Sequence, residues 1–318
     1  SFDWFKKDTK DMLMERPIPL YVGSGSPLSN VGTLTNQGIE LEVGYKLSVD
    51  KVNLSFLANA SYVKNEIKNL GNQTGYIDKE SLPTLGTVSR NENGYPIGYF
   101  FGYKAIGVFQ TQEEIDSYIS PATGKPIQPN AAPGDTKFED LNGDGVISDD
   151  NEDRTMIGKP NPDWIVGLTV AADWNGFDLS AFFQGSFGAD VFDALRRYEL
   201  AAVNYTSDAL ERWTGPGTSN SMPRIVLGDT PKNFRPSTLL VHDASFLRLR
   251  NLQVGYTLPA QLTRKAYIQR LRFYASFDNL LTITGYKGMD PEIGSTMGID
   301  KGVYPQARVY TFGLNLTF

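Results

Sequence analysis

An acidic stretch near the middle of the chain has residue types and a spacing that are typical of a calcium-binding loop. In "DLNGDGVISDDNED", residues 140–153, oxygen-bearing side chains stand at positions 1, 3, 5 and 9 of an EF-hand-like pattern, and glycine stands at the sharp turn in position 6. Calcium takes six to eight oxygen ligands, and this spacing wraps oxygens from one short segment around a single point. The pattern predicts as ligands Asp140, Asn142, Asp144, the carbonyl of Val146, and Ser148.

The closing ligand of this loop departs from the usual pattern. Position 12 normally carries a bidentate carboxylate, and here it is Asn151. Acidic residues lie beside it at Asp150, Glu152 and Asp153, and we predict that Asp153 closes the site in a shifted register. The alternative is an acidic turn that binds no metal. Because no helical pattern flanks the loop, we expect structural Ca²⁺ rather than a calcium-operated switch.

Other chemistries find little support in the chain. It has no cysteine and one histidine, His242, and this composition excludes thiolate sites and multi-histidine zinc sites. We expect His242 to have a structural role. Carboxylates are plentiful in the loops, but no pair stands out as the acid and base of a glycoside hydrolase. We therefore predict no catalytic residues and no enzyme, with a hydrolase as the weaker alternative. The net charge of -6, without a basic patch, argues against nucleic acid as a partner.

The sequence pattern predicts that the elements around this loop are β-strands. In the last stretch, "YTFGLNLTF", large apolar residues alternate with Thr, Gly and Asn, which predicts a strand with a different solvent on each face. Similar alternation recurs along the chain. We predict eight strands, within 2–13, 31–48, 52–62, 164–174, 177–187, 246–258, 271–281 and 310–318.

The connections between these strands alternate strictly between short and long. Tight turns join the strand pairs, whereas the connections over 64–162, 188–243 and 284–306 are long and rich in turns. Outer-membrane barrels have short periplasmic turns and long extracellular loops, so we predict an all-β, antiparallel transmembrane β-barrel. The open alternative is a secreted, calcium-stabilised β-sandwich that binds glycans, because a soluble sandwich alternates too.

Three smaller features sharpen this expectation. Aromatic residues near strand ends, namely Tyr62, Trp164, Trp174 and Tyr256, suit an aromatic girdle at the two membrane interfaces. In 246–258 the apolar phase slips by one residue near Asn251, which predicts a β-bulge with two arginines, 248 and 250, on the polar face. The segment "GYPIGYFFGY", 94–103, could stack on sugars, but we expect it to pack internally.

Several stretches closely resemble signatures of the SusC/RagA family of TonB-linked outer-membrane proteins. The resemblance rests on "DASFLRLRNLQVGYTLP", on "GFDLSAFFQGSFG" and on "NVGTLTNQGIELEV". It also covers "DLNGDG" with the following "DRTMIGKPNPDW", and the terminal "YPQARVYTFGLNLTF". These stretches follow the family's order from one end of the chain to the other.

The resemblance implies a larger assembly than the chain contains. Members form a plugged barrel of about 22 strands, so residues 1–318 would be about eight carboxy-terminal strands of it, with the plug and the amino-terminal strands absent. It also implies import of oligosaccharides, or in some members peptides, powered by TonB through the missing part. A SusD-like surface lipoprotein would form a lid, two such units would pair as a dimer, and the strands would contact the lipid bilayer of the bacterial outer membrane.

Overall fold

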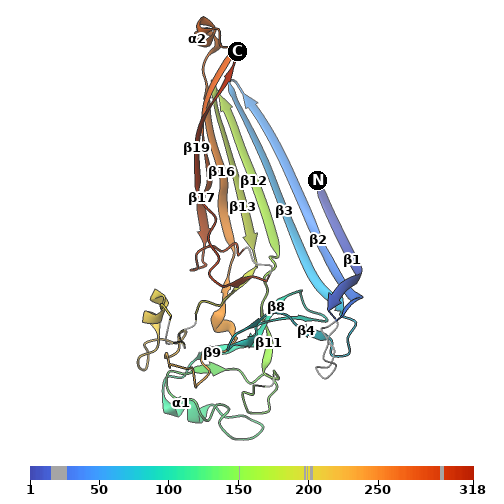
Figure 1. The fold of residues 1–318 in the computed structure, drawn as a ribbon, viewed down its shortest axis with the longest axis vertical. Coiled ribbons are helices and arrows are strands. Elements are labelled where there is room, and N and C mark those ends of the chain that lie inside the picture. Colours follow the sequence, from blue (N-terminus) through green and yellow to red (C-terminus); the bar gives the residue numbers. More distant parts are fainter. Residues whose placement is uncertain (16–26, 150, 197, 199, 201–202, 294–296) are drawn as a thin grey trace.

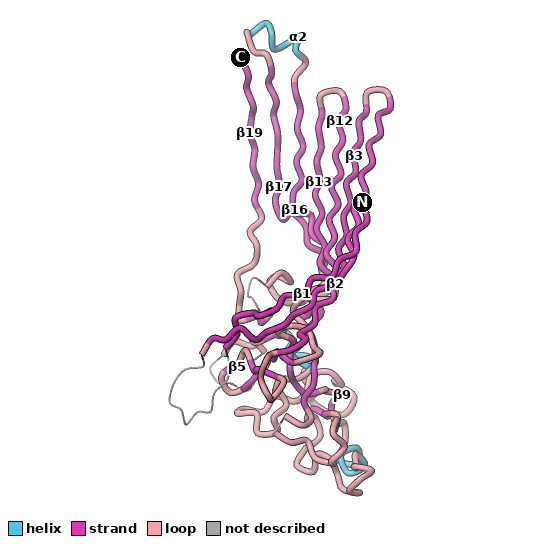
Figure 2. The backbone as a smooth tube through the Cα atoms, turned by 90° about the vertical axis from the view of Figure 1, so that its right-hand side faces the viewer, coloured by secondary structure: helices cyan, strands magenta, loops and turns pink. Residues whose placement is uncertain are grey.

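The computed structural model describes residues 1–15, 27–149, 151–196, 198, 200, 203–293 and 297–318. It separates into a tall sheet and a layer of loops gathered at one end of that sheet (Figure 1). Figure 2 shows the same arrangement from the side, with the strands extending away from the loop layer. Both short hairpin turns, and the carboxy terminus, lie at the end of the sheet away from the loop layer.

The sheet has eight antiparallel strands whose order in space is their order in the chain. All eight predicted strands are therefore confirmed, and β1 and β19 form the two edges. The strands are β1 (Phe2–Glu15), β2 (Leu28–Val49), β3 (Val52–Asn69), β12 (Trp164–Trp174), β13 (Phe177–Phe187), β16 (Phe246–Thr257), β17 (Arg270–Thr284) and β19 (Val309–Thr317).

Local chemistry explains the tight turns. Between β12 and β13, Asn175 and Gly176 have φ values of 48° and 86°. Positive φ at both central residues is what a type I′ turn requires, and Asn-Gly adopts it at little cost. The β16–β17 connection instead holds two short helices, α2 (Ala260–Thr263) and the 3₁₀ helix η4 (Arg264–Ala266). Each of the three long connections begins at the other end of the sheet, beside the loop layer (Figure 1). This agrees with the predicted alternation of short and long connections.

Several strands are longer than the alternation predicts, and β3 shows this most clearly. β3 continues to Asn69, and its final residues still pair with β2, for example Lys64 with Gln37 and Ile67 with Leu34. Backbone pairing continues there although the side chains no longer alternate between apolar and polar. The side-chain pattern marks only the part of a strand with two different surroundings, whereas the hydrogen-bonded ladder continues beyond it.

The loop layer contains short strands and helices with bounds as follows. The strands are β4 (Tyr76–Asp78), β5 (Ser81–Leu82), β6 (Gly86–Thr87), β7 (Ser89–Glu92), β8 (Tyr99–Tyr103), β9 (Ala105–Val108), β10 (Thr136–Phe138), β11 (Arg154–Gly158), β14 (Asp190–Asp193), β15 (Val241–Asp243) and β18 (Ile299–Asp300). The helices are α1 (Gln112–Ser117), η2 (Ser207–Glu211) and η3 (Thr238–Leu240). Among the described residues, every helix is too short or too polar to cross a membrane.

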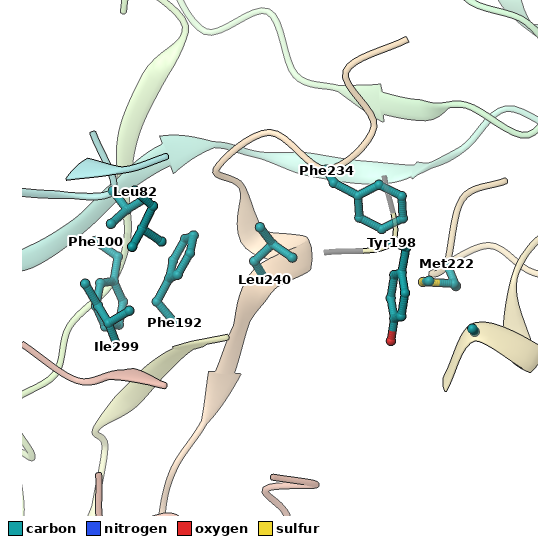
Figure 3. Close-up of a cluster of buried hydrophobic side chains, with 10 residues drawn as sticks. Leu82, Phe100, Phe192, Tyr198, Met222, Phe234, Leu240 and Ile299 are labelled. Carbon is teal, nitrogen blue, oxygen red and sulfur yellow. The ribbon is translucent and has the colours of Figure 1, made fainter. Parts of the chain in front are cut away.

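The main hydrophobic core of the described residues lies in the loop layer, not against the sheet. Figure 3 shows its centre, where Phe100 of β8 and Phe192 of β14 lie 5.8 Å apart between ring centroids. Leu240, from the same connection as Phe192, and Ile299, from the connection after β17, are also almost fully buried. The segment 94–103 contributes to this packing because every residue of β8 is buried, which confirms internal packing rather than a sugar-stacking surface. The three long connections therefore fold together as one packed layer.

Candidate functional site

Most large apolar side chains of the eight strands fall on one face of the sheet. Strand register carries this face across neighbours, from Leu314 to Phe273, then to Tyr256, then to Phe177, and on to Trp174. These side chains are not covered by other described parts of the chain; Phe312, for example, is 76% exposed. A soluble β-sandwich would bury this face against a second sheet. The described structure therefore disfavours the sandwich and fits a face that meets lipid.

Aromatic residues mark the two ends of the apolar face. At the loop end, the rings of Tyr62 and Trp164 lie 5.1 Å apart. At the turn end, Phe177 lies 4.4 Å from Tyr256 and 6.2 Å from Trp174. β12 has 11 residues from one tryptophan to the other, roughly 33 Å at about 3.3 Å per residue. With a strand tilt of about 40°, this distance covers roughly 25 Å, the height of the apolar band of an outer-membrane barrel.

The opposite face of the same strands is polar. Arg272 Nε of β17 donates to Asp178 Oδ1 of β13 at 2.9 Å, which bridges over the intervening strand β16. The bridge crosses at Gly255, where an added Cβ would lie 2.5 Å from both partners. This glycine is therefore required by space rather than by backbone conformation. The polar face is the one that a barrel turns toward its water-filled interior.

A cluster of charges joins this polar face to the loop layer. Arg248 is only 2% exposed, and its guanidinium contacts Asp290 Oδ1 at 2.5 Å, Glu292 Oε2 at 3.1 Å and Thr282 Oγ1 at 2.9 Å. Arg250 contacts the same Glu292 carboxylate at 2.6 Å. Strand register shifts between 249 and 251, which confirms the predicted bulge. The two arginines stand two residues apart in the strand, and both guanidinium groups reach the one Glu292 carboxylate.

Two members of this cluster have no visible signal in the sequence. Asp290 and Glu292 lie in the long connection after β17, where acidic residues are common and nothing relates them to β16. This connection folds back over the polar face of the sheet. Asp290 Oδ2 also accepts the backbone N–H of Gln306 at 3.0 Å. The connection from 285 to 308 is therefore held against the polar face by buried ion pairs rather than left as an open loop.

The calcium-like loop curls around its own carboxylates. Asp140 accepts the backbone N–H of Gly143 at 2.8 Å and that of Gly145 at 2.9 Å. Asp144 accepts the N–H of Val146 at 2.8 Å, and Asn142 accepts the N–H of Asp144 at 3.0 Å. The predicted ligands at positions 1, 3 and 5 thus lie within one compact turn.

The two acidic residues near the end of this loop have different surroundings. Asp153 is fully buried, and its oxygens accept the N–H of Leu141 at 3.1 Å and that of Ser148 at 3.0 Å. Glu152 instead lies beside the loop, where its Oε2 accepts from Asn142 Nδ2 at 2.9 Å. Asp150 lies outside the described residues. Within those ranges, no three histidine, aspartate or glutamate side chains are arranged as a metal site, and the predicted ligand set stays a prediction.

His242 lies in the loop layer at a cleft of about 590 Å³. The cleft is also lined by Arg196, Asp208 and Lys287, and the imidazole Nε2 lies 3.8 Å from Asp193 Oδ2. Burial, together with the nearby Arg196 charge, lowers the pKa of His242 to about 4. The imidazole is therefore neutral at pH 7.

This lowered pKa predicts acid sensitivity of the loop layer. The unfolded chain binds a proton at His242 with an ordinary pKa of about 6.5, whereas the folded chain binds it only near pH 4. Its contribution to stability is therefore present above about pH 6.5 and is lost as the pH falls toward 4. In thermal unfolding of the purified protein, His242→Gln should flatten the pH dependence in this window. Identical profiles for the two proteins would contradict the assignment.

Comparison with known proteins places this geometry in a family. Residues 1–280 match the family described as TonB dependent receptor-like, beta-barrel. TonB-dependent receptor P3 of Formosa agariphila is 32% identical over 332 residues, which cover all of this chain and 32% of that receptor. TonB-dependent receptor SusC of Bacteroides thetaiotaomicron is 30% identical over 325 residues, covering all of this chain and 30% of that receptor.

A solved structure agrees with these matches. The RagAB peptide transporter superposes with a TM-score of 0.77 and 28% identity over all of this chain and 33% of that one. The chain thus spans about a third of the length of the relatives it matches, and the resemblance to SusC and RagA is confirmed. The chain belongs to the TonB-dependent receptor family of outer-membrane β-barrel proteins, and its two-faced sheet is part of such a barrel wall.

Proposed function

We propose that this chain forms wall and loop layer of a TonB-dependent importer of oligosaccharides. The observation that carries the proposal is the sheet with an exposed apolar face and a polar face, the latter tied to a packed loop layer through Arg248 and Arg250. Such a wall offers hydrogen-bonding groups to a polar solute on one side while it contacts lipid on the other. The family membership supports uptake rather than catalysis.

The proposed partners follow from the family. A SusD-like surface lipoprotein covers the loop layer as a lid, TonB supplies the energy through another part of the assembly, and two transporter–lipoprotein units pair as a dimer. The packed loop layer supports this arrangement because a lid needs a surface of defined shape to dock on. Its buried core at Phe100 and Phe192 provides that rigidity.

Uptake by cells tests the proposal. Cells that lack the gene should lose uptake of a fluorescent oligosaccharide, the wild-type gene should restore it, and loss of TonB should abolish it again. Peptide import is the second candidate, because the structural relative RagAB is named a peptide transporter. Restoration of peptide uptake without any oligosaccharide uptake would favour that candidate and contradict ours.

We also propose that residues 140–153 hold one structural Ca²⁺. The observed turn supplies oxygen donors of the hard type that calcium prefers, on a backbone already curled by Asp140 and Asp144. The ion would be held by Asp140, Asn142, Asp144, the Val146 carbonyl and Ser148, with Asp153 closing the loop. Bound there, it would offset the repulsion among the clustered carboxylates.

Removal of the metal should loosen this loop selectively. Chelation, or the double change Asp140→Ala and Asp144→Ala, should increase proteolytic cleavage within 138–154 several-fold, because uncompensated carboxylates repel one another. The exposed pair Lys104 and Glu139, 2.7 Å apart just outside the loop, supplies the control. Lys104→Ala should leave chelator sensitivity unchanged. If neither chelation nor the double change alters cleavage, the loop binds no structural calcium.

A further inference from the structure

A second cavity, of about 410 Å³, opens in the loop layer and is dominated by cationic side chains. Two long connections, the one after β3 and the one after β13, supply its lining, and the cations are Arg154, Lys232 and Arg235. Gly86 and Gly228 also line it, and an added Cβ at either glycine would meet nothing within 4 Å. The cavity therefore combines positive charge with open space.

Arg154 is a partly buried cation that forms no ion pair with any carboxylate of the described residues. Its Nη1 donates to Asn151 Oδ1 at 2.8 Å, and its Nη2 donates to the carbonyls of Phe101, at 2.7 Å, and Thr87. The described carboxylate whose charge acts on Arg154 is Asp78, and Asp78 pairs instead with Arg90. The buried Nε of Arg154 has no hydrogen-bond acceptor in the described structure. A buried charge without a counter-ion is costly, so this nitrogen is a strong potential donor to an entering anion.

Arg235, on the connection after β13, also has a buried guanidinium nitrogen that lacks an acceptor among the described residues. This nitrogen, Nη1, lies 3.8 Å from Asp149 Oδ1. The Arg235 guanidinium stacks on Tyr103, with its central carbon Cζ 4.7 Å from the ring centroid. This stacking fixes the plane in which the guanidinium N–H groups lie. Lys232 pairs with Asp149, and both of these side chains are half or more exposed.

Acidic groups at the cavity do not cancel these charges. Asp149 is shared between Lys232 and Arg235. Asp229 is occupied by the backbone N–H groups of Asn233, at 2.7 Å, and Phe234, at 2.9 Å. Among the described lining residues, three cations thus face two carboxylates, which leaves one positive charge in excess, and two guanidinium N–H groups have no acceptor within that part of the chain.

We propose that this cavity binds an oxyanion, the carboxylate or sulfate of an acidic oligosaccharide, through Arg154 and Arg235. Two oxygens of a carboxylate or of a sulfate ester match the paired N–H groups of arginine, and charge-assisted hydrogen bonds of this kind are about twice as strong as neutral ones. The open space at the two glycines accommodates the attached sugar ring. The inference rests on the proposed oligosaccharide import and narrows its substrate class.

Binding to the intact polypeptide that carries this chain, purified in detergent, tests the inference. The first probes are a galacturonate tetramer and its fully methyl-esterified form, in which each carboxylate is replaced by a neutral methyl ester. The others are a sulfated and a desulfated galactose oligomer, and inorganic sulfate. The wild type should bind at least one acidic oligomer about tenfold or more tightly than its neutral counterpart. Arg235→Gln should remove most of that difference, and Arg235→Lys should keep part of it.

Lys287→Gln is the matched control, because Lys287 is a cation of the other cleft and lies 3.9 Å from Glu211 at an exposed position. It should leave all affinities unchanged, and thermal unfolding checks that every variant is folded. Equal binding of acidic and neutral oligomers, an unchanged preference in Arg235→Gln, competition by acidic peptides alone, or binding of inorganic sulfate alone would each overturn the inference. If the inference failed but neutral oligosaccharides were still imported, the proposed oligosaccharide import would stand. Absence of all oligosaccharide import would instead count against the proposed function.

Discussion

Arginine in place of Leu168 is expected to block assembly of the barrel. Leu168 lies mid-strand in β12, opposite Ala58 on one side and Phe183 on the other, and all three belong to the apolar face. An arginine facing lipid at the midplane costs about 2–4 kcal/mol. The folded fraction in the outer membrane, measured by heat-modifiable gel mobility, should fall severalfold or more. Phe183→Arg should have a similar effect.

Ser180→Arg is the control for this expectation. Ser180 lies on β13 within the same membrane band, but it pairs with Ala171 and Gln253 on the polar face. An arginine there would reach water inside the barrel, so assembly should remain close to that of the wild type. Equal loss of assembly for Leu168→Arg and Ser180→Arg would show that the two faces are wrongly assigned.

Methionine in place of Arg248 is expected to release the connection from 285 to 308. Arg248 and Asp290 have side chains that are only 2% and 7% exposed. Removal of one partner of a buried ion pair leaves the other charge uncompensated, at a cost of about 3–5 kcal/mol. Hydrogen exchange of this connection should become faster by two orders of magnitude or more, while exchange within β12 and β13 should stay unchanged.

Lys301→Met supplies the comparison on the same connection. Lys301 contacts Glu80 at 3.3 Å, but the pair is largely exposed, and exposed pairs contribute about 0–1 kcal/mol. Hydrogen exchange should therefore change little in this variant. If both variants, or neither, accelerated exchange of the connection, the buried cluster would not be what holds it.

The same cluster predicts a response to acid. Burial by itself would raise the pKa of the Asp290 carboxyl, but hydrogen bonds from the backbone N–H groups of Gln306 and Glu292 and from Arg248 outweigh it, so the pKa lies below its ordinary value of 3.8. The stabilisation is therefore complete above about pH 4 and is lost as the pH falls below it. Release of the connection by acid should appear only in that low range, distinct from the effect expected of His242.

Residue pattern alone predicted the strands, the hairpin turns and the bulge. Each depends on neighbours in sequence: alternation over a few residues, the Asn175–Gly176 pair, and a phase slip between Leu249 and Leu252. The aromatic residues at both strand ends were found the same way. The extensions of β2 and β3 were missed, because beyond the membrane band the side chains no longer report the backbone pairing.

The sequence by itself determined strands with two unlike faces, because different surroundings on the two sides impose a period of two that is visible in each strand separately. It predicted lipid on the apolar side from the connection lengths and the aromatic strand ends, and the uncovered apolar face of the sheet then disfavoured the sandwich. Only the tertiary structure decided how the long connections pack and which charges meet. Arg248 and Asp290 lie 42 residues apart, and Arg154 and Arg235 meet at one cavity from different connections. Contacts of this kind depend on where folded loops come to lie in space, and local spacing carries no record of that.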